Sequence, residues 1–213
     1  MHTIENIEDV YLGIEALKQI DPRLLPVIEK AGDIPLRRNP ATFESVLRIV
    51  VGQQVSVACA DAIWSRFKTA WPEPTAELMA GLTSEELCKP GLSRPKAKTV
   101  HAIANEVLSG LDIASLGSID ASMAHKKLIS IHGIGPWTAN IFLLFCAGHP
   151  DVFPAGDVAL QAAVADGLGL LEKPTEKELA NIAIAWSPWR GVAARLFWAY
   201  YKTIKSGGET LPI

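Results

Sequence analysis

The chain has 213 residues, of which 49% are hydrophobic and 20% charged, and its formal net charge at pH 7 is −3. This length and composition suit one domain or two closely joined lobes. The amino terminus carries acids rather than a basic segment followed by an apolar one, which argues against a signal peptide. The longest apolar stretch, residues 141–147, is far shorter than the ~20 residues of a membrane-spanning helix. We therefore expect an intracellular protein without a membrane partner.

The three cysteines, Cys59, Cys88 and Cys146, are scattered through the chain, and none forms a Cys-x-x-Cys pair. This usage favours reduced thiols over a disulfide framework. An iron–sulfur cluster normally takes four thiolate ligands, so the sequence predicts that no such cluster is bound.

Helical patterns dominate, and they follow one another with short connections. Thr42 precedes an amphipathic run as a potential cap, and Ser93 opens another run. No segment alternates with the period of two that is typical of strands. The sequence predicts an all-α fold with helices at residues 43–50, 55–67, 93–108, 123–130, 136–146, 158–167, 177–186 and 189–204.

Acidic residues are absent from two stretches of this otherwise acidic chain, residues 87–105 and 121–150. Basic residues occur in both, which makes the two stretches candidate surfaces for a polyanion. Ordinary solvated helix faces would give the same pattern, so the charge alone leaves both interpretations open. The basic residues are Lys89, Arg94, Lys96, Lys98, Lys126 and Lys127.

One helical pattern stops and another starts within five residues around Gly133 and Gly135. Glycines can adopt backbone angles closed to other residues and let the main chain approach another surface closely. Ile134 is expected to plug the crossing of the two helices, and Pro136 suits a first helical turn. The amides of this turn, at the positive end of a helix, predict a site for a phosphate oxygen. An ordinary tight turn is the alternative, because residues 167–169 have the same spacing where a helix is expected to end.

Asp157 follows a short loop and opens the helical pattern of residues 158–167. An aspartate at this position commonly caps the helix by accepting hydrogen bonds from first-turn amides. The positive end of a helix also favours the anionic carboxylate that a catalytic role requires. The residue alone leaves both roles open, and the two are compatible.

From residue 37 to residue 205 the chain resembles the helix-hairpin-helix DNA glycosylase superfamily, and within it the 3-methyladenine DNA glycosylase II family. The resemblance rests on separate blocks that occur in the family's order. They are residues 51–56 (VGQQVS), 91–97 (GLS followed by KA), 133–139 (GIGPWTA), 151–157 (DVFPAGD) and 186–190 (WSPWR).

The resemblance implies a two-lobed helical fold with a cleft between the lobes. It implies a single glycosylase domain over residues 1–213, with the hairpin at residues 121–147 and the catalytic loop at residues 151–157. Such a protein flips a damaged base out of double-stranded DNA and removes it, leaving an abasic site for base excision repair. The amino-terminal β-domain of longer bacterial relatives is not expected, because the match begins after only about forty residues.

By this resemblance Asp157 is the catalytic carboxylate. It would stabilise the positive charge that builds up on the deoxyribose as the N-glycosidic bond lengthens, and it would orient the attacking water. An alkylated purine such as 3-methyladenine is already cationic and leaves as a neutral base. Trp137, Trp198 and Ile141 match positions that line the base pocket, where aromatic faces attract cationic rings. The tryptophans assigned to packing are Trp64, Trp186 and Trp189.

The resemblance also implies contacts with DNA and an ion. Gln54 is the candidate wedge, the side chain that fills the gap left by the flipped base, although relatives often have a leucine there. A monovalent cation, Na⁺ or K⁺, would bind main-chain carbonyls of the hairpin, and no other cofactor is required. The phosphate-binding residues would be Gly133, Gly135, Thr138, Arg94 and Lys96, and the carbonyls those of Ile129, Ile131 and Ile134.

Superfamily members that nick DNA through a Schiff base carry a lysine at the position of Trp137. The tryptophan at this position therefore predicts a monofunctional enzyme and disfavours a lyase acting on oxidised guanine. We also expect a monomer, located in the cytoplasm or nucleoid, or in a nucleus. The alternative is a helix-hairpin-helix protein that binds damaged DNA without cutting, which needs neither Asp157 nor Trp137. The sequence does not rank 3-methyladenine against 7-methylguanine, hypoxanthine or ethenoadenine.

Overall fold

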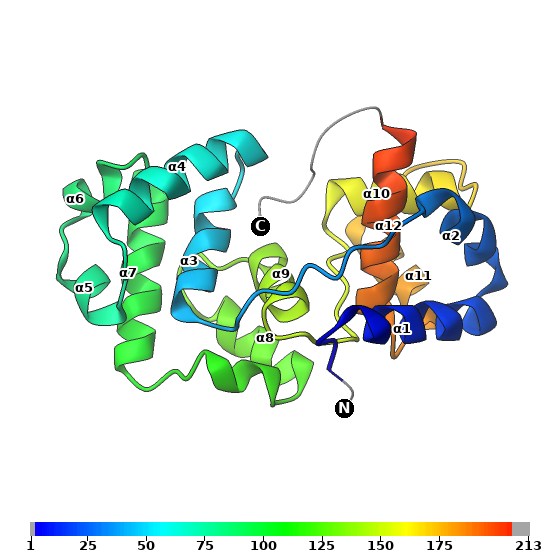
Figure 1. The fold of residues 1–213 in the computed structure, drawn as a ribbon, viewed down its shortest axis with the longest axis horizontal. Coiled ribbons are helices and arrows are strands. Elements are labelled where there is room, and N and C mark those ends of the chain that lie inside the picture. Colours follow the sequence, from blue (N-terminus) through cyan, green and yellow to red (C-terminus); the bar gives the residue numbers. More distant parts are fainter. Residues whose placement is uncertain (1–2, 206–213) are drawn as a thin grey trace. The chain divides into compact units, whose positions relative to one another are not determined.

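The computed structural model describes residues 3–205, and these residues form helices and connecting segments without a strand (Figure 1). The all-α prediction is therefore confirmed. None of the described helices is long and apolar enough to cross a membrane. The α-helices are α1 (Ile7–Ile20), α2 (Leu25–Ala31), α3 (Phe43–Gly52), α4 (Val57–Ala70), α5 (Ala76–Gly81), α6 (Ser84–Cys88), α7 (Arg94–Leu108), α8 (Ala121–Ile129), α9 (Pro136–Phe145), α10 (Val158–Gly167), α11 (Glu176–Ala183) and α12 (Arg190–Ile204), and the 3-10 helices are η1 (Pro22–Leu24), η2 (Ala114–Gly117) and η3 (Ile184–Trp186).

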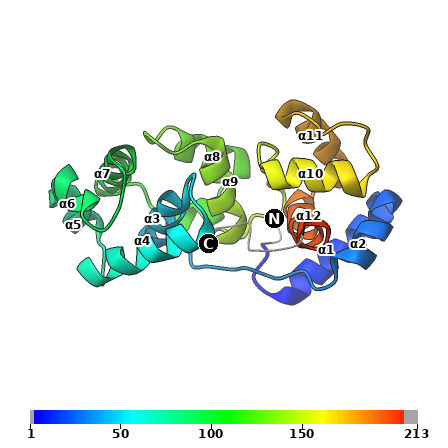
Figure 2. The same cartoon turned by 90° about the horizontal axis from the view of Figure 1, so that it is seen from above.

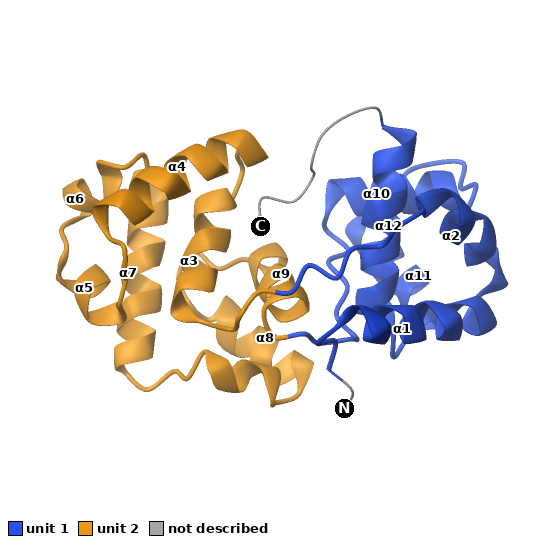
Figure 3. Ribbon diagram, viewed as in Figure 1, with its two compact units in different colours: residues 1–38, 148–210 blue, residues 39–147, 211–213 orange. Residues whose placement is uncertain are grey.

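The chain divides into two compact units, coloured separately in Figure 3. Of the described residues, unit 1 contains 3–38 and 148–205, and unit 2 contains 39–147. Unit 1 is therefore assembled from both ends of the described chain, whereas unit 2 is continuous in sequence.

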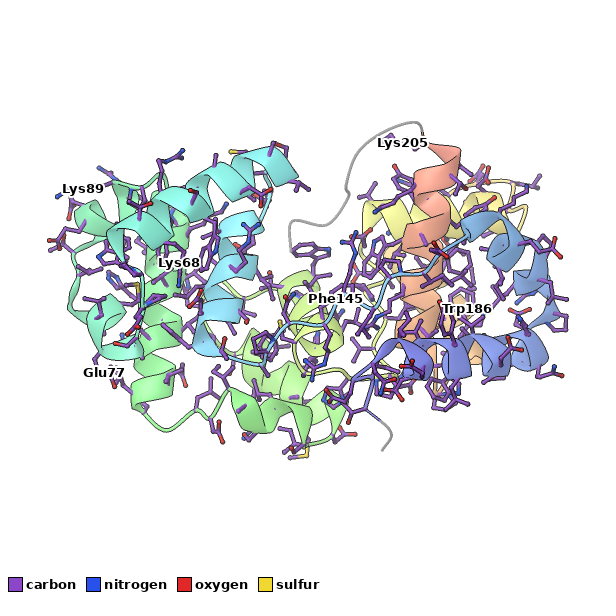
Figure 4. All side chains as sticks on the ribbon, viewed as in Figure 1. Lys68, Glu77, Lys89, Phe145, Trp186 and Lys205 are labelled. Carbon is purple, nitrogen blue, oxygen red and sulfur yellow. The ribbon has the colours of Figure 1, made fainter. Side chains whose placement is uncertain are left out.

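Helix α12 forms the centre of unit 1. It packs against α2 and α10, which lie beside it in Figures 1 and 2. Every residue from 191 to 200 is buried, as expected for a helix that is covered on all sides. Trp186, labelled in Figure 4, is fully buried and its ring lies 5.2 Å from that of Phe197. The assignment of Trp186 to packing is confirmed.

Arg195 is a charged residue inside this buried helix. Its guanidinium group donates to the carbonyls of Leu36, at 3.2 Å from Nε, and Gly191, at 3.0 Å from Nη1. Burial lowers the pKa of Arg195 to about 9, and the positive charge of Arg38 acts in the same direction. The carbonyl acceptors satisfy donors that would otherwise be costly to bury.

Unit 2 is organised around α3, which packs against α4, α7 and α9. Phe67, Phe142 and Phe145 are among its fully buried side chains, and Phe145 is labelled in Figure 4. Trp64 stacks on Phe67 with ring centroids 5.2 Å apart, in agreement with a packing role. The hairpin helices α8 and α9 pack against each other within this unit.

The eight predicted helices are all present, with ends displaced by a few residues. The run at 177–186 differs most, because α11 ends at Ala183 and continues as the 3-10 turn η3. Helices α1, α2, α5 and α6 were not among the predicted elements. Helices α5 and α6 are only 6 and 5 residues long, and each begins at a threonine N-cap, Thr75 and Thr83, rather than with a long amphipathic pattern.

Candidate active site

The catalytic loop predicted at residues 151–157 is anchored at its start to the beginning of α12. Asp151 accepts hydrogen bonds from Arg190 Nε at 2.7 Å, Arg190 Nη2 at 2.9 Å and Ser187 Oγ at 2.9 Å. Burial raises the pKa of Asp151, but the hydrogen bonds from Arg190 and Ser187 outweigh it and hold the pKa below its usual value. The Gly191 amide also donates to the Pro150 carbonyl at 2.6 Å. These contacts hold the first residue of the loop in place against the start of α12.

At the end of the loop, Asp157 is the N-cap of α10. Its Oδ1 accepts hydrogen bonds from the Leu160 amide at 3.0 Å and from the indole Nε1 of Trp198 at 3.3 Å. The Asp157 side chain is half-buried, so two donors orient a carboxylate that solvent still reaches. The cap expected from the sequence is confirmed, and the indole donor is a contact that the sequence did not indicate.

Trp198 lies on α12, two turns beyond Arg190, so the same helix supports both ends of the loop. Its side chain is only 4% exposed, and its indole N–H is directed at Asp157. This geometry assigns Trp198 to orienting the carboxylate. Its predicted place in the wall of a base pocket stays a prediction.

The hairpin glycines of unit 2 serve different purposes. Gly133 has φ +84°, and a Cβ there would lie 1.8 Å from Thr99 Oγ1 on α7. Gly135 has an ordinary φ of −88°, and apart from its own chain neighbours no heavy atom of the described residues lies within 4 Å of a Cβ built on it. The expectation of special backbone angles therefore holds for Gly133 and is wrong for Gly135. Ile134 between them is buried, as predicted.

Helix α9 begins at Pro136, and no side chain caps it at Gly135. The first-turn amides of a helix have no partner within the helix, and the positive end of its dipole lies there. Gly135 is half-buried, and the open space beside it gives an incoming group access to this turn. The arrangement suits an anion such as a phosphate.

Thr138, expected to bind phosphate, is only 3% exposed. Its Oγ1 accepts a hydrogen bond of 2.9 Å from Gln53 Nε2, which also donates to the Gly133 carbonyl at 3.2 Å. The hydroxyl therefore holds the hairpin to the end of α3, and any phosphate contact at Thr138 would come from its main-chain amide. Sequence reasoning gave Gln53 no role, although it lies in the VGQQVS block.

Lys96 and Arg94, the two other predicted phosphate ligands, open α7. The ammonium group of Lys96 donates to the Val51 carbonyl at 2.8 Å, and burial lowers its pKa. Lys96 therefore supports the end of α3 from a half-buried position, while Arg94 is exposed. Gln54, the candidate wedge, is exposed and has φ +54°, a left-handed conformation that is uncommon for residues other than glycine.

Two predicted pocket residues lie on α9. Trp137 is half-buried in its first turn, and Ile141, one turn further on, is fully buried. Of the three carbonyls predicted to hold a cation, that of Ile131 accepts a hydrogen bond of 3.0 Å from the Ile134 amide. Unit 1 contains Asp157 and Trp198, and unit 2 contains the hairpin and every other predicted site residue.

The chain matches a protein-family model and several known proteins over most of its length. A family model described as "HhH-GPD superfamily base excision DNA repair protein" matches residues 47–188. A DNA-3-methyladenine glycosylase of Bacillus subtilis is 30% identical over 217 aligned positions, covering 90% of this chain and 72% of that protein.

Two solved structures are similar over most of this chain. The crystal structure of a DNA-3-methyladenine glycosidase from Bacillus halodurans has a TM-score of 0.78 at 31% identity, covering 90% of this chain and 88% of that one. A 3-methyladenine DNA glycosylase of Schizosaccharomyces pombe, in complex with abasic DNA, has a TM-score of 0.73 at 25% identity and covers 87% of this chain and 93% of that one.

Proposed function

We propose that the chain, which belongs to the HhH-GPD superfamily of base excision DNA repair proteins, is a monofunctional DNA glycosylase acting on alkylated purines such as 3-methyladenine. The observation that carries this proposal is the carboxylate of Asp157, oriented by the Leu160 amide and the Trp198 indole. The relatives from two bacilli and a yeast, each named for 3-methyladenine, support the choice of substrate class.

Asp157 stabilises the transition state of N-glycosidic bond cleavage in this proposal. As the bond between sugar and base lengthens, positive charge develops on the deoxyribose, and a negative group fixed beforehand lowers the barrier without having to reorganise. Two donors on Oδ1 supply that fixed orientation. The same carboxylate orients the water that attacks the sugar. An alkylated base leaves as a neutral molecule, so no strong general acid is needed.

The hairpin holds the DNA strand without reading its sequence. The first turn of α9 offers main-chain amides to a phosphate oxygen beside Gly135, where no Cβ blocks the approach. Exposed Arg94, Lys126 and Lys127 add positive charge on the surface of unit 2. The reaction product is an abasic site, because Trp137 stands where a lysine would form a Schiff base.

A monovalent cation fits the chemistry of the hairpin turn. Neutral main-chain carbonyls are suitable ligands for Na⁺ or K⁺, and the carbonyl oxygen of Ile131 keeps a second lone pair beside its hydrogen bond from Ile134. Ile129, Ile131 and Ile134 would hold the ion, which would supply positive charge near the phosphate. The enzyme acts as a monomer in this proposal and requires no other cofactor.

The test is incubation of the purified protein with methylated duplex DNA. Release of 3-methyladenine or 7-methylguanine into solution, with alkali-labile sites left in the DNA, is the expected result. Tight binding without release would instead favour a damage-binding protein. Strand cleavage that borohydride traps as a covalent complex would identify a lyase and overturn the monofunctional assignment.

A further inference from the structure

Gln53 links two parts of unit 2 that the proposed function uses separately. Its Nε2 donates to the Gly133 carbonyl at 3.2 Å and to Thr138 Oγ1 at 2.9 Å, 80 and 85 residues further along the chain. A main-chain carbonyl only accepts hydrogen bonds, so the orientation of the Gln53 amide is determined, and both of its protons are engaged. The side chain is thus attached both to the turn of the hairpin and to the first turn of α9.

Gln53 is also the residue directly before the candidate wedge. It caps the C-terminal end of α3, where its amide donates to the Val50 carbonyl at 3.2 Å. Gln54 follows with φ +54°, and Ser56 already caps α4, accepting a hydrogen bond from the Cys59 amide. The turn that carries Gln54 is therefore short and held by a helix at each end.

Helix α7 braces the same two parts from one side. Thr99 packs so closely against Gly133 that no Cβ fits between them, and the Lys96 ammonium group holds the Val51 carbonyl. These contacts attach both the hairpin and the end of α3 to α7. Each contact, however, involves either the hairpin or the end of α3, and not both. The side chain of Gln53, at the end of α3, connects the two directly through its hydrogen bonds to the Gly133 carbonyl and Thr138 Oγ1.

We propose that Gln53 is a positioning residue. It holds the candidate wedge Gln54 at a fixed position relative to the DNA strand bound at the hairpin, so that binding of this strand brings Gln54 into the duplex. The inference rests on the proposed glycosylase function. Without the Gln53 amide the hairpin keeps its glycines and the first turn of α9, so duplex binding persists. The turn carrying Gln54 loses its attachment to the bound strand, so extrusion of the base becomes inefficient.

The test compares Gln53→Met with the wild-type protein, because methionine keeps the length of the side chain and removes the hydrogen bonds. Three quantities are measured: the single-turnover release of methylated purines, the Kd for an undamaged duplex, and base extrusion by the fluorescence of 2-aminopurine in a duplex. We expect release and extrusion to fall by about tenfold or more, in line with the cost of misplacing reacting groups. The Kd should change by less than about threefold, since phosphate contacts dominate affinity.

Two further variants separate positioning from general stability. Thr138→Val removes one acceptor and keeps its shape, so it should show part of the defect, and the double variant should be no worse than Gln53→Met alone. Gln19→Met changes an exposed glutamine of α1 in unit 1 and should leave all three quantities unchanged. The melting temperature of each variant is measured in parallel.

Wild-type rates of base release and extrusion in Gln53→Met would overturn this inference but not the proposed function. Parallel losses of duplex binding, release and melting temperature would also overturn it, because they would make Gln53 a stability residue only. A wild-type protein that releases no methylated base would overturn the proposed function, and the inference with it. The failures of the two ideas are therefore distinguishable.

Discussion

Trp198 donates its indole N–H to Asp157 Oδ1 at 3.3 Å, and a second pair of the same kind lies elsewhere in unit 1. There, Trp186 donates to Asp21 Oδ2 at 3.0 Å. Asp21 is buried and also paired with Arg23, whereas Asp157 is half-buried at the start of α10. The unit thus contains one tryptophan–aspartate pair suited to stability and one suited to chemistry, which allows a matched comparison.

Trp198→Phe should slow excision and leave duplex binding unchanged. The substitution keeps an aromatic ring in the buried site but removes a donor to a carboxylate, an interaction of about 1.5–3 kcal/mol, so a loss of about tenfold or more in single-turnover rate is expected. Trp186→Phe is the control: it should lower the melting temperature, because buried Asp21 loses a donor, while excision proceeds at the wild-type rate. Equal excision rates in the two variants would contradict the orienting role of Trp198.

Asp157→Asn should abolish most of the excision activity. The amide keeps an oxygen for the Leu160 and Trp198 donors but removes the negative charge that stabilises the sugar, and losses of about 10²–10³-fold are typical for such groups. Duplex binding should remain close to wild type. Asp33→Asn, at an exposed position after α2, is the control. Near-wild-type release by Asp157→Asn would mean that another residue carries the chemistry.

Substitution of the two hairpin glycines by alanine should affect different properties, namely stability at Gly133 and duplex binding at Gly135. Gly133→Ala combines φ +84° with a Cβ placed 1.8 Å from Thr99 Oγ1, so the free energy of unfolding should fall by about 2 kcal/mol or more. Gly135→Ala should leave stability unchanged but weaken duplex binding by about tenfold, because a methyl group would stand where the phosphate approaches the α9 amides. Melting curves and duplex Kd values measure the two effects. A stable Gly133→Ala, or full binding by Gly135→Ala, would contradict this division.

The free energy of unfolding should decrease as the pH drops from 7 to 5, because His125 is harder to protonate in the folded protein than in the unfolded chain. Burial lowers the pKa of this imidazole on α8 below the ordinary 6.5, although its hydrogen bond with the Pro136 main chain acts in the opposite direction. The unfolded chain therefore takes up a proton before the folded one, and acid favours unfolding. Asp21 and Asp151, whose pKa values are lowered by their arginine partners, affect stability only below about pH 5, where carboxyl groups of the unfolded chain begin to take up protons.

The measurement is the melting temperature between pH 7 and pH 5. His125→Gln should flatten this dependence, while His132→Gln, at an exposed position of the hairpin, should leave it as in the wild type. An unchanged pH dependence in His125→Gln would show that His125 does not cause it.

Several features could be predicted from the sequence because they depend on residues close together in the chain. The cap at Asp157 involves an amide three residues away, and Pro136 begins its helix as a first-turn proline should. Helix α10 has the expected bounds because its pattern is uninterrupted from Val158 to Gly167. The short helices α5 and α6 escaped prediction, since six or five residues carry too little periodicity.

The contacts that position the candidate site could not be predicted in this way. Gln53 is 85 residues from Thr138, and Trp198 is 41 residues from Asp157, so these pairs form only when separate helices pack at particular angles. The same holds for Lys96, whose charge predicted a phosphate ligand but whose ammonium group is occupied by the Val51 carbonyl.

What the sequence by itself determined was the all-helical class, the order of its motifs and the residue types available for chemistry, because hydrogen bonding within helices and caps is local. The tertiary structure alone decided the direction of each functional group. Gly133 and Gly135 are identical in sequence terms, yet Thr99 packs against one and open space lies beside the other, a difference created only when α7 packs against the hairpin.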